Sequence, residues 1–222
     1  GIQFPCRRDR EAGKMEHTLI VAGIGPGNRD YILPKALDAV TDSRFLAGSR
    51  RALADYARPG QETFPVTGDL QSLETWISAS LQKGDVTVMV SGDPGYYSLL
   101  PWLKRKFPQA AMEVIPGISS VQMAFCRISE PWQEAELLSF HGRRPAEGKM
   151  TYEKGKKLAF LTDGEHNPAY ICRHLLSLGW PETARIDVLE HLSYENENKA
   201  EITLSEGCSL AGFPESILVV MG

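Results

Sequence analysis

Three glycine-rich turns are the parts of this sequence whose residue types suggest chemistry. Each follows a short apolar run and precedes a segment with helical spacing; they are Gly23–Gly27, Ser91–Ser98 and Pro116–Val121. Glycine has no Cβ, so such a turn can lie close to a ligand, and a helix that starts there offers free N–H groups to an anion. The ordinary alternative is a tight strand-to-helix turn in which Asp93 or Ser119 caps the helix.

The better-known ligand and catalytic motifs are absent from the sequence. A dinucleotide fingerprint GxGxxG would need a third glycine where Asn28 stands, and the second expected strand runs into Gly48–Arg50 rather than into an acidic residue. There is no phosphate-binding GxxxxGK[ST] motif and no GxSxG nucleophile motif. Cys172 and His174 lie close in sequence, but no further ligands stand at metal-site spacing, so no metal is expected.

Strands and helices are expected to alternate in the first half of the chain. Continuous apolar runs predict buried strands at Thr18–Ile24, Arg44–Ala47, Gln61–Val66 (an edge strand, because of Pro65), Val86–Ser91 and Met112–Ile115. Helical spacing predicts helices at Tyr31–Val40, Ser49–Tyr56, Leu70–Lys83, Tyr96–Lys106 and Ser119–Cys126. This alternation is typical of a mostly parallel sheet, which would place the three turns at one edge.

The second half has a different pattern. Strands are expected at Leu137–Phe140, Lys157–Leu161, Arg185–Leu192, Ala200–Leu204 and Ser216–Met221, with one helix at Ala169–Leu178 and a long loop at His141–Gly155. Consecutive strands with short connections indicate antiparallel pairing and hence a mixed sheet. We therefore expect two α/β domains, an N-terminal one at 17–118 and a C-terminal one at 119–222, with residues 1–16 as a disordered or cloning-derived tail.

Composition narrows the class of protein. Hydrophobic residues make up 42% and charged residues 23% of the chain, as in a globular protein. The longest uncharged stretch, Val114–Cys126, is too short to cross a bilayer. The net charge is −4, and Glu182–Glu206 holds seven acidic and two basic residues, which argues against nucleic-acid binding. Four scattered cysteines without a CxxC pair favour a cytoplasmic protein over a secreted one.

The ordered motifs GIGPG, SGDPGYYS and PGISS resemble those of the tetrapyrrole methylases, two-domain S-adenosylmethionine enzymes of cobalamin biosynthesis. The resemblance covers Thr18–Gly222. Gly48–Arg51, Ser139–Arg143 and Thr162–Pro168 resemble the branch that methylates C5 of a precorrin, either cobalt-precorrin-7 or precorrin-6Y. The resemblance implies an α/β fold with a mostly parallel N-terminal sheet, a mixed C-terminal sheet and a cofactor cleft between the domains.

The resemblance also implies where S-adenosyl-L-methionine, and its product S-adenosyl-L-homocysteine, would bind. From the three turns the implied residues are Ile24, Pro26, Asp93, Tyr96, Ser120 and Val121. From the second domain they are Leu161, Thr162 and Leu192, the last beside His191. For these second-domain residues, ordinary strand packing is an equally good interpretation.

The reaction implied is methyl transfer from a sulfonium to a macrocycle carbon, which calls mainly for alignment and exclusion of water. A base for the proton lost afterwards is expected among His141, Asp163 and His166, although each could be an ordinary loop residue.

The carboxylates of the substrate call for arginines, and we expect Arg50 and Arg143 rather than their neighbours Arg51 and Arg144. Tyr97, like Tyr96 and Phe140, could stack on the macrocycle or simply pack.

Two other functions stay open. One is the same fold acting on another acceptor, such as a different precorrin carbon, diphthine or ribosomal RNA. The other is a module that binds S-adenosylmethionine or a tetrapyrrole without turnover. We expect a homodimer. In fused relatives C15 methylation and decarboxylation belong to a second methyltransferase module, which these 222 residues do not contain. Two alternatives therefore stay open: a stand-alone C5 enzyme that works with a separate C15-methylating, decarboxylating protein, or a piece of a fused enzyme.

Overall fold

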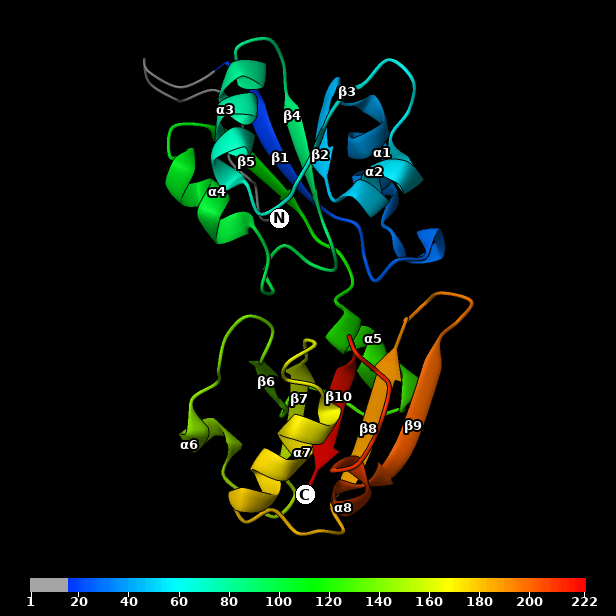
Figure 1. Cartoon of the computed structure of the whole chain (residues 1–222). Coiled ribbons are helices and arrows are strands. Elements are labelled where there is room, and N and C mark those ends of the chain that lie inside the picture. Colours follow the sequence, from blue (N-terminus) through cyan, green and yellow to red (C-terminus); the bar gives the residue numbers. More distant parts are fainter. Residues whose placement is uncertain (1–15) are drawn as a thin grey trace, which may run out of the picture. The chain divides into compact units, whose positions relative to one another are not determined.

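A computed structural model describes residues 16–222, so the expected tail lies, except for Glu16, outside the described residues. The described chain divides into two compact units. Unit 1 contains the described residues up to Gly25 and then Arg29–Ile118, and unit 2 contains Pro26–Asn28 and Ser119–Gly222 (Figure 1). Pro26 and Gly27 of the first glycine turn, together with the following Asn28, therefore belong with the C-terminal part of the chain. The apolar pattern did not predict this division.

Unit 1 is built on a five-stranded parallel sheet in the order β3-β2-β4-β1-β5. Its strands are β1 (Thr18–Gly23), β2 (Phe45–Gly48), β3 (Glu62–Pro65), β4 (Val86–Val90) and β5 (Ala111–Ile115). Its helices are η1 (Arg29–Tyr31), α1 (Pro34–Asp42), α2 (Arg50–Tyr56), α3 (Leu70–Leu81) and α4 (Leu100–Lys106). The expected strands and their parallel arrangement are confirmed, and β3 lies at an edge as Pro65 predicts.

Alternation along the strands buries both faces of this sheet. Leu19 and Val21 of β1 share a core with α3 and α4, whereas Ala22 packs with α1 and α2. Figure 1 shows the two helix pairs on opposite sides of the strands. Covering both faces explains why β4 is buried at every position and reads as an uninterrupted apolar run.

Two helices of unit 1 begin later than the sequence predicts. The helix expected from Tyr31 begins at Pro34, whose fixed φ suits the first helical turn. The helix expected from Tyr96 begins at Leu100. The residues before it form a tight turn instead, in which Gly95 N donates to Asp93 Oδ2 at 2.7 Å and Tyr97 has a positive φ of 48°.

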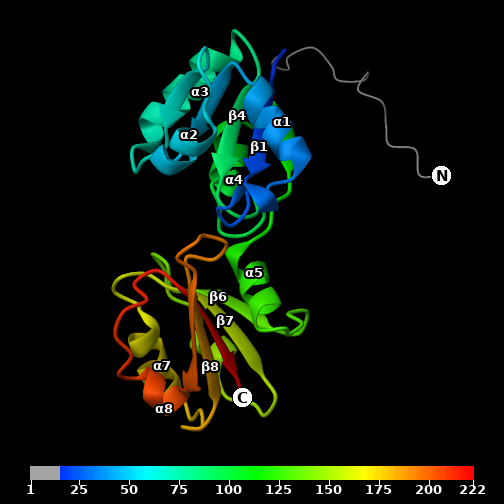
Figure 2. The same ribbon diagram turned by 90° about the vertical axis from the view of Figure 1, so that its right-hand side faces the viewer.

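Unit 2 is built on a five-stranded mixed sheet in the order β6-β7-β10-β8-β9, as expected. Only β6 and β7 pair in parallel. The strands are β6 (Glu136–Ser139), β7 (Lys157–Leu161), β8 (Arg185–Glu190), β9 (Asn198–Thr203) and β10 (Ile217–Met221). The helices are α5 (Ser120–Arg127), α6 (Glu147–Met150), α7 (Pro168–Ser177) and α8 (Leu204–Gly207). Figure 2 shows α7 and α8 on one face of the sheet and α5 on the other.

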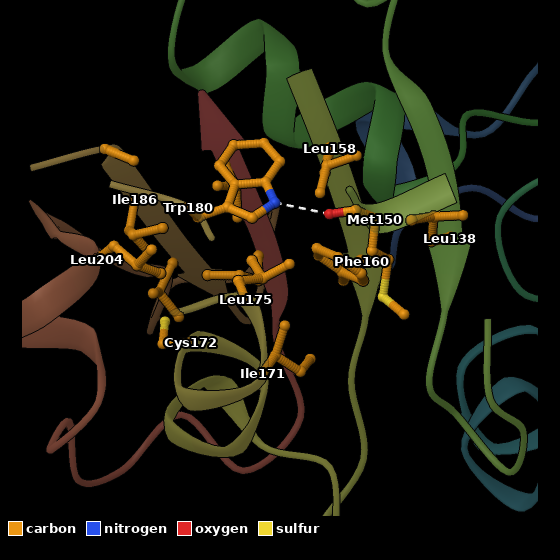
Figure 3. Packing of buried hydrophobic residues seen from close by; sticks show 14 of the residues in the cluster. Leu138, Met150, Leu158, Phe160, Ile171, Cys172, Leu175, Trp180, Ile186 and Leu204 are labelled. Atoms are coloured by element: carbon orange, nitrogen blue, oxygen red, sulfur yellow. Dashed lines mark hydrogen bonds between the residues drawn. The ribbon is translucent and has the colours of Figure 1, made fainter. Parts of the chain in front are cut away.

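Two short helices were not predicted from the sequence. Helix α6 lies where a loop was expected, and helix α8 begins where a strand was expected to end. Leu204 was expected to end a strand, but Thr203 and Glu206 form a capping box that starts α8 at Leu204. The core of unit 2 lies between the sheet and α7 and includes Phe160 and Leu175 (Figure 3). Buried Trp180 donates its indole N–H to Met150 O at 2.6 Å, so its polar atom is satisfied.

None of the helices in the described part of the chain combines the length and the apolar character needed to cross a membrane.

Candidate functional site

The three glycine turns meet at the carboxyl edge of the sheet in unit 1. Gly25 and Gly92 form an isolated antiparallel bridge, with N···O distances of 3.2 and 2.9 Å. A Cβ on Gly117 would lie 2.2 Å from Gly92 O, and one on Gly23 would lie 2.8 Å from Gly117 N. The turns are thus packed backbone against backbone, which only glycine permits at these positions.

Asp93 joins the second turn to the third. Its Oδ2 accepts from Gly95 N at 2.7 Å, and its Oδ1 accepts from Gly117 N at 3.0 Å. The alternative role, capping the following helix, is wrong, because α4 begins at Leu100 without a side-chain cap. The Asp93 carboxylate is only half-buried and keeps further lone pairs for a ligand.

The hydroxyl of Tyr96 is buried and has no hydrogen-bond partner among the described residues. Burial raises the pKa of Tyr96, and the neighbouring Tyr97 raises it further. Tyr96 is therefore a neutral donor that a bound ligand would satisfy. The ring of Tyr97, at 44% exposure, packs edge-on against it with centroids 4.8 Å apart.

Arg50 stands at this same edge. It is exposed at the first position of α2, directly after Ser49, whose Oγ accepts from Ala52 N at 3.1 Å. Because β2 ends at Gly48 and runs parallel to β4 and β1, Arg50 follows a strand end on the side where the turns gather. Arg51 is also exposed.

In unit 2, the segment Pro26–Asn28 packs against the loop that follows β8. Asn28 N donates to Ser193 Oγ at 2.9 Å, and Asn28 Nδ2 donates to Ser193 O at 3.1 Å. A Cβ on Gly27 would overlap the ring of Tyr194. Through this contact, the segment that contains Pro26 lies against the loop that contains the buried Leu192, although the two residues are far apart in sequence.

Of the other residues expected to bind the cofactor, Ile24 is buried in unit 1, where its N–H donates to Val90 O at 2.9 Å. The rest belong to unit 2. Ser119, not Ser120, caps α5 by accepting from Val121 N at 3.2 Å. Val121 is buried, and Ser120 is half-buried in the first turn. Thr162 is buried, and its Oγ1 donates to Ser216 O at 2.9 Å, so its side chain joins β7 to β10. Leu161 is the half-buried end of β7. The strand-packing interpretation fits these last two side chains.

Asp163 organises the loop between β7 and α7. Its Oδ1 accepts from Glu165 N at 3.0 Å and from His166 N at 2.6 Å, and its Oδ2 accepts from Gly142 N at 3.0 Å. These backbone donors, chiefly those of His166 and Gly142, hold the pKa of Asp163 far below its usual range. Such a weakly basic carboxylate is a poor proton acceptor, so Asp163 suits an orienting role better than the base role expected for it.

His166 and His141 each have one ring nitrogen engaged. His166 Nδ1 lies 3.2 Å from Asp163 Oδ1, and His141 Nδ1 lies 3.1 Å from Thr162 O. An ionised carboxylate and a carbonyl can only accept, so each neutral imidazole carries its proton on Nδ1 and presents a basic Nε2. His141 is exposed, whereas the side chain of His166 is 18% exposed.

Aromatic side chains form a wall around His166. Its ring lies 5.3 Å from that of Phe140 and 5.0 Å from that of Tyr170. Phe140 is fully buried, so of its two alternatives, packing and stacking on a substrate, the structure shows packing. The guanidinium of Arg144 lies over Tyr170 at 5.9 Å, and Arg143 is exposed beside it. Tyr170 was missed in the sequence, because one tyrosine within an apolar helix pattern carries no signal of its own.

The family model for "Tetrapyrrole (Corrin/Porphyrin) Methylases" matches residues 18–207. The cobalt-precorrin-7 C(5)-methyltransferase of Salmonella typhimurium is 34% identical over 81% of this chain and 87% of its own. The probable cobalt-precorrin-7 C(5)-methyltransferase of Methanocaldococcus jannaschii is 28% identical over 85% of this chain and 90% of its own.

A solved structure of the methyltransferase CobJ superposes with a TM-score of 0.78 at 18% identity, over 92% of this chain and 94% of that one, which shows a shared fold. Given the family match over most of its length, this chain belongs to the tetrapyrrole methylases and is an S-adenosylmethionine-dependent methyltransferase.

Proposed function

We propose that the protein transfers a methyl group from S-adenosylmethionine to C5 of a precorrin macrocycle, cobalt-precorrin-7 or precorrin-6Y. One observation carries the choice of acceptor: the relatives named cobalt-precorrin-7 C(5)-methyltransferases align over most of their own length as well as most of this chain. The segments Gly48–Arg51, Ser139–Arg143 and Thr162–Pro168, which suggested the same branch, hold Arg50, Arg143 and the Asp163–His166 pair.

The residues of the turn edge fit the cofactor. The glycines let the three turns pack backbone against backbone at one sheet edge, and the unpartnered hydroxyl of Tyr96 offers a donor there. S-adenosylmethionine, when bound, supplies an electrophilic methyl group. In unit 1 we assign its binding to Ile24, Asp93 and Tyr96. In unit 2 we assign it to Pro26, Ser120, Val121 and Leu192, and to the backbone of Leu161 and Thr162.

His166 is proposed as the base. After the new carbon–carbon bond has formed, a proton must leave the macrocycle, and we assign Nε2 of His166 to receive it. Asp163 keeps the proton of the neutral ring on Nδ1 and stabilises the imidazolium that forms, because its carboxylate stays ionised. His141 presents its Nε2 in the same tautomer but is exposed, which leaves it as the second candidate.

Arg50, Arg143 and Tyr97 are proposed to hold the substrate. The arginines would pair with its acetate and propionate carboxylates, and the exposed ring of Tyr97 would lie against the macrocycle.

Arg143→Ala should weaken substrate binding about tenfold and leave cofactor affinity unchanged, because a charge-assisted hydrogen bond is lost. Arg143→Lys should restore this only in part if the contact is bidentate.

A methyl-labelled donor tests the function directly. With precorrin substrate, NMR of the product should show one labelled methyl at C5, and no carbon dioxide should be released. Label at another carbon would assign the protein to another branch of the family. Cofactor binding without turnover on any precorrin would favour the non-catalytic module, and turnover on diphthine or ribosomal RNA would favour those acceptors.

We also propose a cytoplasmic homodimer that works beside a separate C15-methylating, decarboxylating protein. The compartment is supported by the cysteines of the described chain, Cys126, Cys172 and Cys208, which are all free thiols. The dimer and the partner protein rest on the family resemblance. Sedimentation analysis of the purified protein, and carbon dioxide release on addition of such a partner, would test them.

A further inference from the structure

The loop between β8 and β9 is held in an uncommon backbone conformation. His191 and Ser193 have φ angles of 52° and 74°, in the left-handed region that favours glycine. Leu192, one of the residues assigned to the cofactor, lies between them and is buried. Non-glycine residues keep such angles only where the surroundings enforce them, and they gather at functional sites.

The carboxylate of Glu197 contacts this loop at Ser193. Its Oε1 accepts from Ser193 N at 2.7 Å, and both of its oxygens accept from Arg127 Nε, at 3.1 and 2.8 Å. Burial raises the pKa of Glu197, but the hydrogen bonds from Arg127 and Ser193 outweigh it and the net pKa is lowered, so the carboxylate is ionised at neutral pH. Arg127 is the last residue of α5, so this ion pair fastens the loop to a helix end.

The loop in turn holds the end of the first glycine turn. Ser193 is bonded on its other side to Asn28, through Oγ at 2.9 Å and through its carbonyl at 3.1 Å. Tyr194 packs so closely on Gly27 that no side chain fits there. A continuous chain of contacts therefore runs from Arg127 through Glu197 and Ser193 to Asn28, all within unit 2.

We propose that Glu197 is a positioning residue for the cofactor site, which fixes Ser193 and through it Leu192 and the segment Pro26–Asn28. Glu197 itself contacts no ligand in this scheme. The inference rests on the proposed function, because it assumes that Pro26 and Leu192 touch the cofactor. Without the ion pair the loop and the turn would be ordered only on binding, and the entropy of that ordering would reduce affinity.

The chain offers a matched control. Lys157 and Glu130 form an ion pair of the same 2.8 Å length and similar exposure in unit 2. Glu130 follows α5, and its carboxylate accepts from Lys157 at the start of β7. Glu130→Gln removes a comparable ion pair without touching the proposed chain of contacts.

Calorimetry with S-adenosylhomocysteine, on the full protein, tests the proposal. Glu197→Ala should raise the dissociation constant about tenfold, while kcat at saturating cofactor stays near wild type. Glu197→Gln, which can still accept from Ser193 N, should give a smaller increase. Ser193→Ala should weaken binding too, and its effect should not add to that of Glu197→Ala, because both act through one contact chain. Glu130→Gln should leave affinity unchanged.

Wild-type affinity in folded Glu197→Ala, or an equal loss in Glu130→Gln, would overturn the proposal. If Glu197→Ala does not fold, the graded effect of Glu197→Gln and the loss in Ser193→Ala decide, and normal affinity in both overturns it. A wild-type protein that does not bind S-adenosylhomocysteine would instead contradict the proposed function.

Discussion

Asp93 in unit 1 and Asp163 in unit 2 both accept hydrogen bonds from backbone N–H groups, but the two carboxylates differ in how many they accept. Each follows a strand, and each carboxylate accepts from a glycine N–H far along the chain, Gly117 for Asp93 and Gly142 for Asp163. Asp93 accepts one backbone N–H on each oxygen, whereas Asp163 accepts three and also contacts the His166 ring. A carboxylate with few donors can still bind a ligand, but one surrounded by donors serves to hold its loop and orient a histidine.

The largest expected effect comes from the imidazole that Asp163 orients. His166→Gln should lower kcat about 10²- to 10⁴-fold, the usual contribution of a general base, and leave cofactor affinity near wild type. Single-turnover kinetics with labelled cofactor, together with calorimetry, would measure both. A kcat near wild type would remove His166 from the proton transfer, and the same substitution at His141 would then be the next test.

The glycine packing of unit 1 should be the next most sensitive feature. In Gly117→Ala the new Cβ would meet Gly92 O at 2.2 Å, and backbone on both sides cannot give way. We expect a loss of about 1–3 kcal/mol in the free energy of unfolding, as for strained core substitutions, and loss of cofactor binding.

Gly68→Ala is the control for Gly117→Ala, since no atom lies within 4 Å of a Cβ at that position. Equal unfolding midpoints for the two variants in urea would show that the three turns are not held by close packing.

The two aspartates should then separate in their effects on affinity. Asp93→Ala should weaken S-adenosylhomocysteine binding by about 1.5–3 kcal/mol, as for loss of a charged hydrogen bond, and should also lower stability, because Gly117 N loses its acceptor. Asp163→Ala should lower stability and kcat with little change in cofactor affinity. Calorimetry and thermal unfolding of both variants would measure this.

A matched variant for these substitutions is Asp69→Ala, since Asp69 only caps α3 by accepting from Ser72 N at 3.1 Å. It should lower stability alone. Similar affinities of Asp93→Ala and Asp163→Ala for S-adenosylhomocysteine would show that the two carboxylates do not differ in cofactor binding.

The smallest expected effect is a pH dependence of stability. The pKa of Asp163 is lower in the folded than in the unfolded protein, so the unfolded state binds more protons at acid pH. The stabilisation is present above the unfolded pKa of about 4 and is lost as pH falls below it. The Tm difference between wild type and Asp163→Asn should therefore be constant from about pH 5 to 7 and shrink below about pH 4. A difference unchanged down to pH 3 would contradict this.

The elements of the fold could largely be predicted from local patterns. Fully buried strands such as Val86–Val90 and amphipathic helices such as Leu70–Leu81 occur where apolar spacing indicates them. The boundary at Leu100 could not be predicted, because the helical spacing continues back to Tyr96. In the structure, the hydrogen bond from Gly95 N to Asp93 and the positive φ of Tyr97 form a turn in place of the first helical residues.

The candidate site was predicted only in part. The glycine turns and their common edge follow from residue type and parallel topology. The orienting role of Asp163, the closeness of Tyr170 to His166 and the support of Ser193 by Glu197 did not. Aspartate, tyrosine and glutamate are common on loops and helices, so nothing in their spacing distinguishes these three.

The sequence by itself determined the alternation of strands and helices, the glycines that backbone contact requires, and the family motifs. These depend on residues close together in the chain, where periodicity and the lack of a Cβ have direct consequences. Only the tertiary structure decided which polar atoms meet, as Asp93 meets Gly117 and Ser193 meets Asn28. Those hydrogen bonds join residues 24 and 165 positions apart, and their donors are backbone N–H groups, which every residue type except proline carries.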